Sequence, residues 1–468
     1  DPNDRSTFNN MENAVFNIAA DGDVFDVNYT SSIFHNHPGA LLVKSAGADA
    51  AILNDYEFVN AGEVRVESGT LRFGGRLTID PGAVFEAPLG TSAFAGETIL
   101  NTLLLSSGNL VLESGFLRGS TNSEGAQLAS YAGSGSFDWE GGTISGIFGV
   151  EPGSVLNITG PATKNLDSGC VFNNSGTVNW HEGRIYNSAF TLQQRAVFNN
   201  LTNASFNIHG DGEVFNSSYN RPLFINHPGA SIAKLDGDGI TTINYFAIEN
   251  YGEIHQSSGS LLFNDILTLH ENSKVSGEGT MYWEKEININ GNVFADCDIE
   301  FRSGTLTGAR DTNGAALASW GGSGILTWLG GSVNGAIVIQ PGSKWEISGA
   351  NTKQLGVAAV IENFGTMIWR GPGKISASAN TLQQRAVINT HGLFDLQDDG
   401  DAFESFYNLS LFNVQPGGRL QKSVSGGVSE LSGFSFRNSG EVEASTGAIH
   451  FAGYLEIESG SAFRGDVK

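Results

Sequence analysis

Apolar and polar residues alternate with a period of two along short stretches throughout the chain. Within residues 63–73, for example, Val64 and Val66 alternate with polar residues in one short stretch, and Leu71 and Phe73 do so in the next. This alternation predicts short β-strands with one buried face, and it places these four side chains in the interior. No segment between the strands has the 3.6-residue spacing of an amphipathic helix. The pattern therefore predicts an all-β protein.

Two kinds of corner separate the predicted strands. The first is Asn-x-Gly followed directly by a new strand, and because Asn and Gly both tolerate positive φ, each copy predicts a tight corner. It occurs at Asn60, Asn174, Asn250, Asn363 and Asn438. The second is Pro-Gly followed by a small residue, where proline presets φ for a turn. It occurs at Pro38, Pro81, Pro152, Pro228, Pro341 and Pro416.

The chain repeats itself. TLQQRAV begins at Thr191 and again at Thr381, and the Pro-Gly corners that begin at Phe34, Phe224 and Phe412 align at offsets of 188 to 190. These offsets define three continuous modules without linkers: residues 1–190, 191–380 and a partial third module, 381–468. A stacked coil can be lengthened by duplicating a block of its turns, whereas a β-sandwich would not repeat the same corners in the same order.

The predicted fold is therefore a single elongated parallel β-solenoid. With turns of about 20 to 24 residues, the chain makes roughly 20 turns. At about 4.8 Å per turn, such a body is about 100 Å long.

Charge narrows the range of partners. The chain has 49 acidic and 25 basic residues, for a formal net charge of −24. Nucleic acids and anionic lipids require a clustered positive surface, so neither is expected as a primary partner. No apolar run is long enough for a transmembrane segment. Cys170 and Cys297 are separated in the sequence by several solenoid turns, which predicts two separate buried thiols.

Four tryptophans recur between modules. Trp139 matches Trp328, and Trp180 matches Trp369. They are candidates for sugar-stacking platforms, but they share the inward parity of their strands, and large aromatic residues fill wide cores well. The parity favours a place in the core.

Asp-Gly clusters are the first candidate metal ligands. They recur as Asp21 with Asp23, Asp211 with Glu213, and Asp399 with Asp401, and a further cluster comprises Asp236 and Asp238. Calcium takes six to eight oxygen ligands, and close acidic turns supply several of them. The alternative is ordinary turn chemistry, for which Asp-Gly is common. Calcium is the one cofactor that the sequence leaves open.

An acidic strip is the second candidate. Asp296, Asp298 and Glu300 alternate with apolar residues, so all three carboxylates are expected on one outward face of a strand. Such a strip can bind a cation or supply the acid and base of glycoside cleavage. It is equally the pattern of a solvated strand face. The sequence contains no recognisable nucleophile or cofactor motif.

The Asn-x-Gly corners, the Pro-Gly turns and strands such as residues 68–73 (SGTLRF) resemble the β-helical passenger and stalk regions of bacterial autotransporters and filamentous-haemagglutinin-like adhesins. The resemblance implies export, a right-handed parallel β-helix and a role at the cell surface. The resemblance assigns no functional residue to this chain, because it rests on corner sequences that solenoids have in common.

We therefore expect a secreted structural or adhesive solenoid, either a surface stalk or a subunit of an extracellular fibre or surface layer. Solenoid ends expose unpaired strand edges, which favours self-association end to end or laterally. A glycan or a host-cell surface is a further expected partner. The alternative is a polysaccharide lyase or glycoside hydrolase on the same scaffold, although the sequence favours a protein that is not an enzyme.

Overall fold

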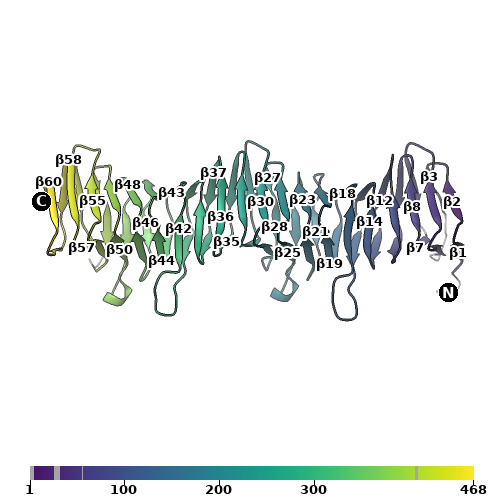
Figure 1. The fold of residues 1–468 in the computed structure, drawn as a ribbon, viewed down its shortest axis with the longest axis horizontal. Coiled ribbons are helices and arrows are strands. Elements are labelled where there is room, and N and C mark those ends of the chain that lie inside the picture. Colours follow the sequence, from purple (N-terminus) through teal and green to yellow (C-terminus); the bar gives the residue numbers. More distant parts are fainter. Residues whose placement is uncertain (1–4, 26–31, 55, 406–408) are drawn as a thin grey trace. The chain divides into compact units, whose positions relative to one another are not determined.

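The computed structural model describes residues 5–25, 32–54, 56–405 and 409–468. Strands account for 56% of the structure and helices for 1%, and the parallel strands stack as a β-solenoid of about 20 turns (Figure 1). The all-β solenoid prediction is confirmed. Among the described residues, no helix has the length and apolar character that crossing a membrane requires.

The chain divides into two compact units. Unit 1 comprises Asp1–Gly237 and Asn244–Ala247, and unit 2 comprises Asp238–Ile243 and Ile248–Lys468. The division falls inside the second sequence module. Each unit is described separately below.

In unit 1 the strands form three parallel faces, and a strand typically pairs with the third strand after it. The first face contains β1 (Thr7–Asn10), β4 (Ser32–Asn36), β7 (Tyr56–Asn60), β10 (Arg76–Ile79), β13 (Glu97–Leu100), β16 (Phe116–Gly119), the first half of β19 (Thr143–Val150), β21 (Lys164–Leu166), β24 (Ile185–Asn187) and β28 (Phe215–Ser217). The second contains β2 (Val15–Ile18), β5 (Leu41–Lys44), β8 (Glu63–Val66), β11 (Val84–Glu86), β14 (Leu103–Ser106), β17 (Ser130–Gly133), the second half of β19, β22 (Val171–Asn174), β25 (Val197–Asn200) and β29 (Leu223–Asn226). The third contains β3 (Gly22–Asp23), β6 (Ala50–Leu53), β9 (Thr70–Phe73), β12 (Thr91–Phe94), β15 (Asn109–Leu112), β18 (Ser136–Trp139), β20 (Val155–Ile158), β23 (Thr177–Trp180), β26 (Ser205–Ile208) and β30 (Ser231–Lys234). The short strand β27 (Gly212–Glu213) follows β26, and the 3₁₀ helix η1 (Leu192–Gln194) precedes β25.

Unit 2 repeats this plan with three faces. The first contains β32 (Ala247–Asn250), whose first residue belongs to unit 1, β35 (Ile266–Leu269), β38 (Glu286–Ile289), β41 (Thr305–Gly308), the first half of β44 (Ser332–Ile339), β46 (Lys353–Leu355), β49 (Ile375–Ala377) and β53 (Phe403–Ser405). The second contains β33 (Glu253–Gln256), β36 (Ser273–Gly277), β39 (Asn292–Ala295), β42 (Ala318–Gly321), the second half of β44, β47 (Val360–Asn363), β50 (Val387–Thr390), β54 (Leu411–Val414), β57 (Ser435–Asn438) and β59 (Leu455–Ile457). The third contains β31 (Ile240–Ile243), β34 (Ser260–Phe263), β37 (Thr280–Trp283), β40 (Asp298–Phe301), β43 (Ile325–Trp328), β45 (Lys344–Gly349), β48 (Thr366–Pro372), β51 (Leu393–Leu396), β55 (Arg419–Lys422), β58 (Glu441–Phe451) and β60 (Ala462–Val467). In addition, β56 (Val428–Leu431) pairs with the second half of β58, and β52 (Gly400–Asp401) pairs with β56. The 3₁₀ helix η2 (Leu382–Gln384) precedes β50.

Turn length varies more than the sequence predicts. Leu77 stacks on Phe58, 19 positions earlier, whereas Phe215 stacks on Ile185, 30 positions earlier. The longer of these two turns contains the η1 loop, which lies between β24 and β25. The pairing of β25 with β22 on the preceding turn stays in register. The range of turn lengths expected from the sequence is therefore too narrow.

The core follows the predicted parity. Val64, Val66, Leu71 and Phe73 are buried, and so are all four recurring tryptophans, which confirms their place in the core. Cys170 and Cys297 are buried free thiols, also as predicted. Burial raises the pKa of each thiol to about 12, so both are protonated at neutral pH.

Aligned residues on successive turns form interior ladders. In unit 1, Asn174 donates to Asn200, and Asn200 donates to Asn226, each at 2.8 Å between Nδ2 and Oδ1. Asn10, Asn36 and Asn60 form the same ladder earlier in the chain, also at 2.8 Å per step. Asn10 and Asn174 also donate to main-chain oxygens at the corner, so their amide groups are buried with hydrogen-bond partners, whereas the Nδ2 of Asn60, at the end of its ladder, has none.

The Asn-x-Gly corner is correctly located, but the predicted reason for it is wrong. Asn60 and Asn174 end their strands with negative φ, and the glycine that follows each, Gly62 or Gly176, also lacks a positive φ. The Asn is required by the ladder. The glycine is required by space, because a Cβ on Gly176 would lie 2.5 Å from the main-chain oxygens of both Glu151 and Ser154. Positive φ occurs instead at the Pro-Gly corners, for example at Gly153.

Candidate functional site

The Asp-Gly turns contain an ion pair that the sequence analysis did not foresee. In each module the first aspartate of the cluster meets a lysine from the following turn, and the side chain of that lysine is fully buried. The Nζ–Oδ1 distances are 2.8 Å for Lys44 and Asp21, 2.7 Å for Lys234 and Asp211, and 2.7 Å for Lys422 and Asp399.

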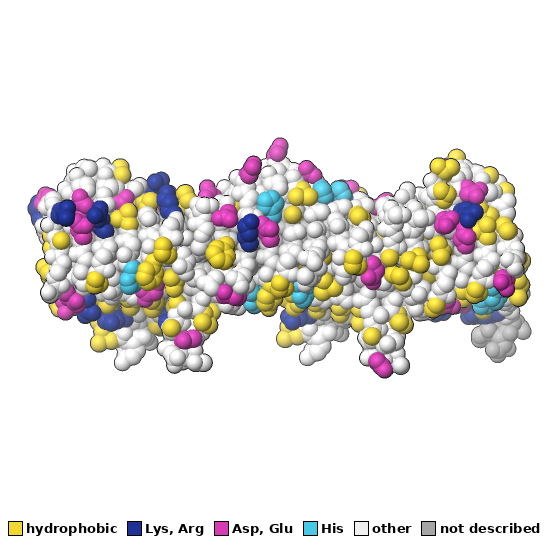
Figure 2. Space-filling model, in the orientation of Figure 1, with side chains coloured by type: hydrophobic (Ala, Val, Ile, Leu, Met, Phe, Trp, Pro, Cys, Tyr) yellow, Lys and Arg dark blue, Asp and Glu magenta, His cyan; other side chains and the backbone are white. Residues whose placement is uncertain are grey.

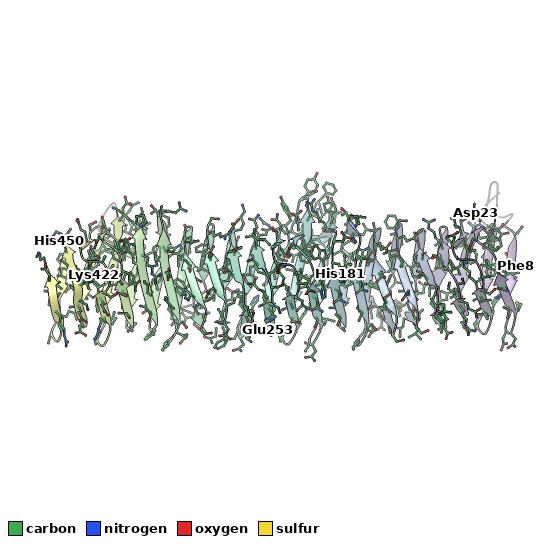
Figure 3. All side chains as sticks on the ribbon, turned by 90° about the horizontal axis from the view of Figure 1, so that it is seen from above. Phe8, Asp23, His181, Glu253, Lys422 and His450 are labelled. Atoms are coloured by element: carbon green, nitrogen blue, oxygen red, sulfur yellow. The ribbon has the colours of Figure 1, made fainter. Side chains whose placement is uncertain are left out.

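Local sequence explains this geometry. Lys44, Lys234 and Lys422 are the last residues of β5, β30 and β55, and each has inward parity. The aliphatic part of the side chain lies in the core, while the ammonium group reaches the next corner. There the Nζ of Lys44 also donates to the main-chain oxygens of Ala46 (2.7 Å) and Gly47 (3.1 Å). We call these lysine–aspartate pairs the corner clips; Figure 3 labels Lys422.

The clips alter the electrostatics of the carboxylates. The hydrogen bond from Lys44 is the largest cause that lowers the pKa of Asp21, and that from Lys422 does the same for Asp399. Both aspartates therefore remain ionised below the usual pH range for a carboxyl group. Their negative charge offsets the positive charge of a lysine that has no access to water.

The second acidic residue of each cluster has a different partner. Arg184 lies 2.5 Å from Glu213, and Lys374 lies 2.9 Å from Asp401 at the equivalent place in unit 2. The hydrogen bond to Asp401 is also the largest cause that raises the pKa of Lys374. Asp23 accepts a hydrogen bond of 3.4 Å from Asn54. Of the fourth cluster, Asp236 lies 2.7 Å from His209 Nδ1.

A second set of buried lysines lies beside two of the recurring tryptophans. The Nζ of Lys164 donates to the main-chain oxygens of Gly160 and Glu182. In the matching corner of unit 2, Lys353 donates to Gly349 at 2.6 Å. Burial lowers the pKa of each of these two lysines to about 8.

These two lysines predict a gain in stability at alkaline pH. The folded-state pKa of about 8 lies below the value of 10.5 for a free lysine, so the unfolded chain binds more protons between these limits and the free energy of unfolding rises with pH. We expect Lys353→Met to lose roughly 2 kcal/mol of the gain between pH 7.5 and pH 9.5. Urea unfolding at pH 7.5 and pH 9.5 measures the change in the free energy of unfolding for each protein. The exposed Lys285→Met serves as the control, and an equal pH response in wild type and Lys353→Met would contradict the assignment.

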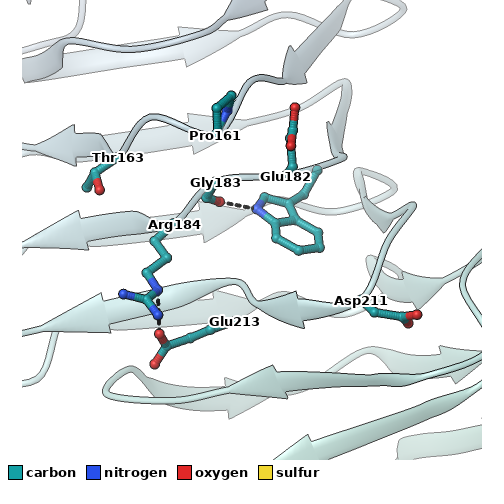
Figure 4. Close-up of a pocket in the computed structure, with 8 residues that line it drawn as sticks. Pro161, Thr163, Glu182, Gly183, Arg184, Asp211 and Glu213 are labelled. Carbon is teal, nitrogen blue, oxygen red and sulfur yellow. Dashed lines mark hydrogen bonds and ion pairs between the residues drawn. The ribbon is translucent and has the colours of Figure 1, made fainter.

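A shallow depression of about 310 Å³ adjoins this corner in unit 1 (Figure 4). Trp180 donates from Nε1 to the main-chain oxygen of Gly183, and Arg184 pairs with Glu213 across the opening. Asp211 also lines it. Arg184 is paired with Glu213 and Asp211 with Lys234, which is the arrangement of a braced corner.

Asp298 and Glu300 lie on the outward face of β40, as predicted, whereas Asp296 lies in the corner between β39 and β40 and is exposed there. Asp296 accepts hydrogen bonds from the main-chain nitrogen (3.2 Å) and the hydroxyl (3.1 Å) of Ser323 on the next turn. Asp298 accepts one from the nitrogen of Ile325 at 3.0 Å. Two of the three carboxylates therefore brace the adjacent turn.

The third carboxylate of the strip has a cationic partner. Glu300 accepts a hydrogen bond from Arg302 Nε at 2.9 Å, and the guanidinium of Arg302 lies 3.5 Å from the ring centroid of Tyr282. A cation stacked on a ring is held in place, so the pair is fixed on the surface. On the face drawn in Figure 2, basic side chains adjoin acidic ones at several places.

The structure does not bring the candidate metal ligands together. Over the described residues, no three His, Cys, Asp or Glu side chains gather in a group that could hold a metal ion. The sequence analysis missed the buried lysines. Their signal was present, since Lys44, Lys234 and Lys422 align at the module offsets and have the inward parity of their strands.

Comparisons with protein-family models, with curated proteins and with solved structures find no match for this chain.

Proposed function

We propose that the chain is a secreted structural or adhesive β-solenoid that serves as a surface stalk or as a subunit of an extracellular fibre or surface layer. The observation that carries the proposal is the duplication of surface features, each at an equivalent place in unit 1 and unit 2. A scaffold gains reach and valency from such duplication.

The first duplicated feature is the loop that contains the 3₁₀ helix. Gln194 Oε1 accepts from the main-chain nitrogens of Phe190 (3.2 Å) and Thr191 (3.1 Å), and Gln384 accepts from Asn380 (3.2 Å) in unit 2. The main-chain oxygen of Gln194 accepts from Gly169, so the loop is fixed to the adjacent turn. The loops thus hold their shape in both units.

The second duplicated feature is a hairpin that leaves the stacked strands (Figure 1). Antiparallel bridges between Thr121 and Gln127 and between Arg310 and Ala316 close the two hairpins. In unit 2 the carboxylate of Asp311 accepts from two main-chain nitrogens of its hairpin, as the amide of Asn122 does in unit 1. Both units therefore present a loop and a hairpin as pre-formed surface elements.

Localisation tests the proposal. An antibody against the chain is expected to label intact cells that produce it, and fractionation is expected to recover the chain outside the cell or bound to its surface. Recovery from the cell interior alone would contradict the proposal.

The alternative is a polysaccharide lyase or glycoside hydrolase, and the fixed group of Glu300, Arg302 and Tyr282 beside Asp298 is the observation in its favour. Outward carboxylates beside an aromatic ring are groups that sugar cleavage uses. The discriminating variant combines Asp296→Asn, Asp298→Asn and Glu300→Gln. Cleavage of a polysaccharide by the wild type that the variant loses would support the alternative, whereas a wild-type chain that cleaves none supports the scaffold.

A further inference from the structure

Three asparagines of unit 2 are followed directly by glycine. They are Asn290, before Gly291; Asn313, before Gly314; and Asn334, before Gly335. In such a pair the main-chain nitrogen of the glycine can approach the side-chain amide of the asparagine closely, because glycine has no Cβ to obstruct it. The structure places the three pairs in different surroundings, so their reactivity is expected to differ.

Two of the pairs are packed against a neighbouring turn. A Cβ on Gly291 would lie 2.3 Å from the Oε2 of Glu271, and a Cβ on Gly335 would lie 1.9 Å from the main-chain oxygen of Gly308. Gly335 is also in register with Gly308 in the parallel strands β44 and β41. The space beside both glycines is filled, so a ring can close there only if two turns of the solenoid separate.

The third pair lies at the tip of the hairpin between β41 and β42. Among the described residues, nothing lies within 4 Å of a Cβ added to Gly314. Asn313 is exposed, so its side chain can rotate onto the main chain. One turn hydrogen bond, from the nitrogen of Gly314 to the oxygen of Asp311 at 3.0 Å, has to open first. Loop tips open at a much lower free energy than paired strands do.

We propose that Asn313 is a site of deamidation through a succinimide. The main-chain nitrogen of Gly314 forms a bond to the Cγ of Asn313, the bond from Cγ to the amide nitrogen breaks, and ammonia leaves with the proton of the Gly314 nitrogen. Water then opens the ring at one of its two carbonyl carbons, which yields aspartate or isoaspartate. The net reaction consumes one water, releases one ammonia and requires no oxidant or reductant.

The reaction changes the hairpin of unit 2 and leaves that of unit 1 intact. The carboxylate of Asp311 accepts from the main-chain nitrogens of Asn313 (2.9 Å) and Ala315 (2.8 Å). A second negative charge at position 313 repels Asp311, and isoaspartate adds a carbon atom to the main chain within this turn, so the turn loosens. In unit 1 the matching residue is Glu124, which would have to close a larger ring. The inference goes beyond the proposed function and does not depend on it.

Peptide mapping of the full chain tests the proposal. Folded chain and chain unfolded in urea are incubated at mildly alkaline pH, digested with chymotrypsin and analysed by tandem mass spectrometry. Trp320 and Trp328 lie between Asn313 and Asn334, so cleavage after tryptophan separates these two sites. In the folded chain Asn313 is expected to convert at least about tenfold faster than Asn290 and Asn334, because the rate follows the population of the open form. The unfolded chain is expected to convert all three at similar rates.

Asn313→Gln is the matched control, because glutamine would have to close a six-membered ring. It is expected to stay unmodified at position 313 while Asn290 and Asn334 react as in the wild type. A folded wild type in which Asn313 reacts no faster than the other two asparagines would overturn the inference. A product at position 313 that contains aspartate but no isoaspartate would indicate direct hydrolysis and would overturn the succinimide route.

Discussion

Gly176→Ala is expected to lower the free energy of unfolding of unit 1 by about 3 kcal/mol or more. An added Cβ would lie 2.5 Å from two main-chain oxygens, those of Glu151 and Ser154, and neither can rotate away as a side chain would. The adjacent turns must therefore separate, which disrupts the hydrogen bonds of the ladder beside them. Urea unfolding monitored by tryptophan fluorescence measures the loss.

Gly153→Ala is the control for this substitution. Gly153 has a φ of 78° but nothing lies within 4 Å of an added Cβ. Gly153→Ala should therefore lower the free energy of unfolding only through its strained backbone conformation, by about 1–2 kcal/mol. A Gly176→Ala variant that is as stable as Gly153→Ala would show that turn spacing does not select the glycine of the Asn-x-Gly corner.

Asn200→Ala is expected to lower the free energy of unfolding by about 3 kcal/mol. Asn200 is fully buried, donates to Asn226 (2.8 Å) and to the main-chain oxygen of Ser231 (2.9 Å), and accepts from Asn174 (2.8 Å). Alanine removes all three hydrogen bonds at once from a region that water does not reach. Thermal and urea unfolding measure the change.

Asn207→Ala provides the comparison, because Asn207 donates to Asn179 at 3.0 Å in a half-buried ladder on the outside of the same unit. Water replaces that hydrogen bond, so the expected cost is below about 1 kcal/mol. Equal losses for the two variants would contradict the structural role of the interior ladder.

The fold was predictable because its signal is repeated many times. The period-two parity placed Val64, Leu71, Trp139 and Trp180 correctly in the core, and the module offsets implied stacked turns. Parity says which way a side chain points, but it does not say what lies beside it on the next turn. For that reason the Asn-x-Gly corner was located correctly but explained by φ instead of by the Asn ladder and the spacing of the turns.

The candidate site was less predictable because its partners come from different turns. Asp21 and Lys44 are distant in the sequence and meet only when the solenoid closes one turn. In the sequence, a lysine at an inward position at the end of a strand looks like a break in the alternation of apolar and polar residues. Its acidic partner can be recognised only when the corner on the neighbouring turn is known. The acidic strip shows the same limit, since Ser323 and Ile325 contact it from the following turn of the chain.

Electron microscopy of the purified chain at rising concentration, with and without calcium, tests the central claim most directly. The account predicts that copies of the chain join into ordered filaments or sheets. It also predicts that this assembly proceeds without calcium, because the acidic turns of the corner clips already hold a lysine. Isolated particles at every concentration would contradict the fibre or layer form of the proposal, and assembly only when calcium is added would contradict the role assigned to the corner clips.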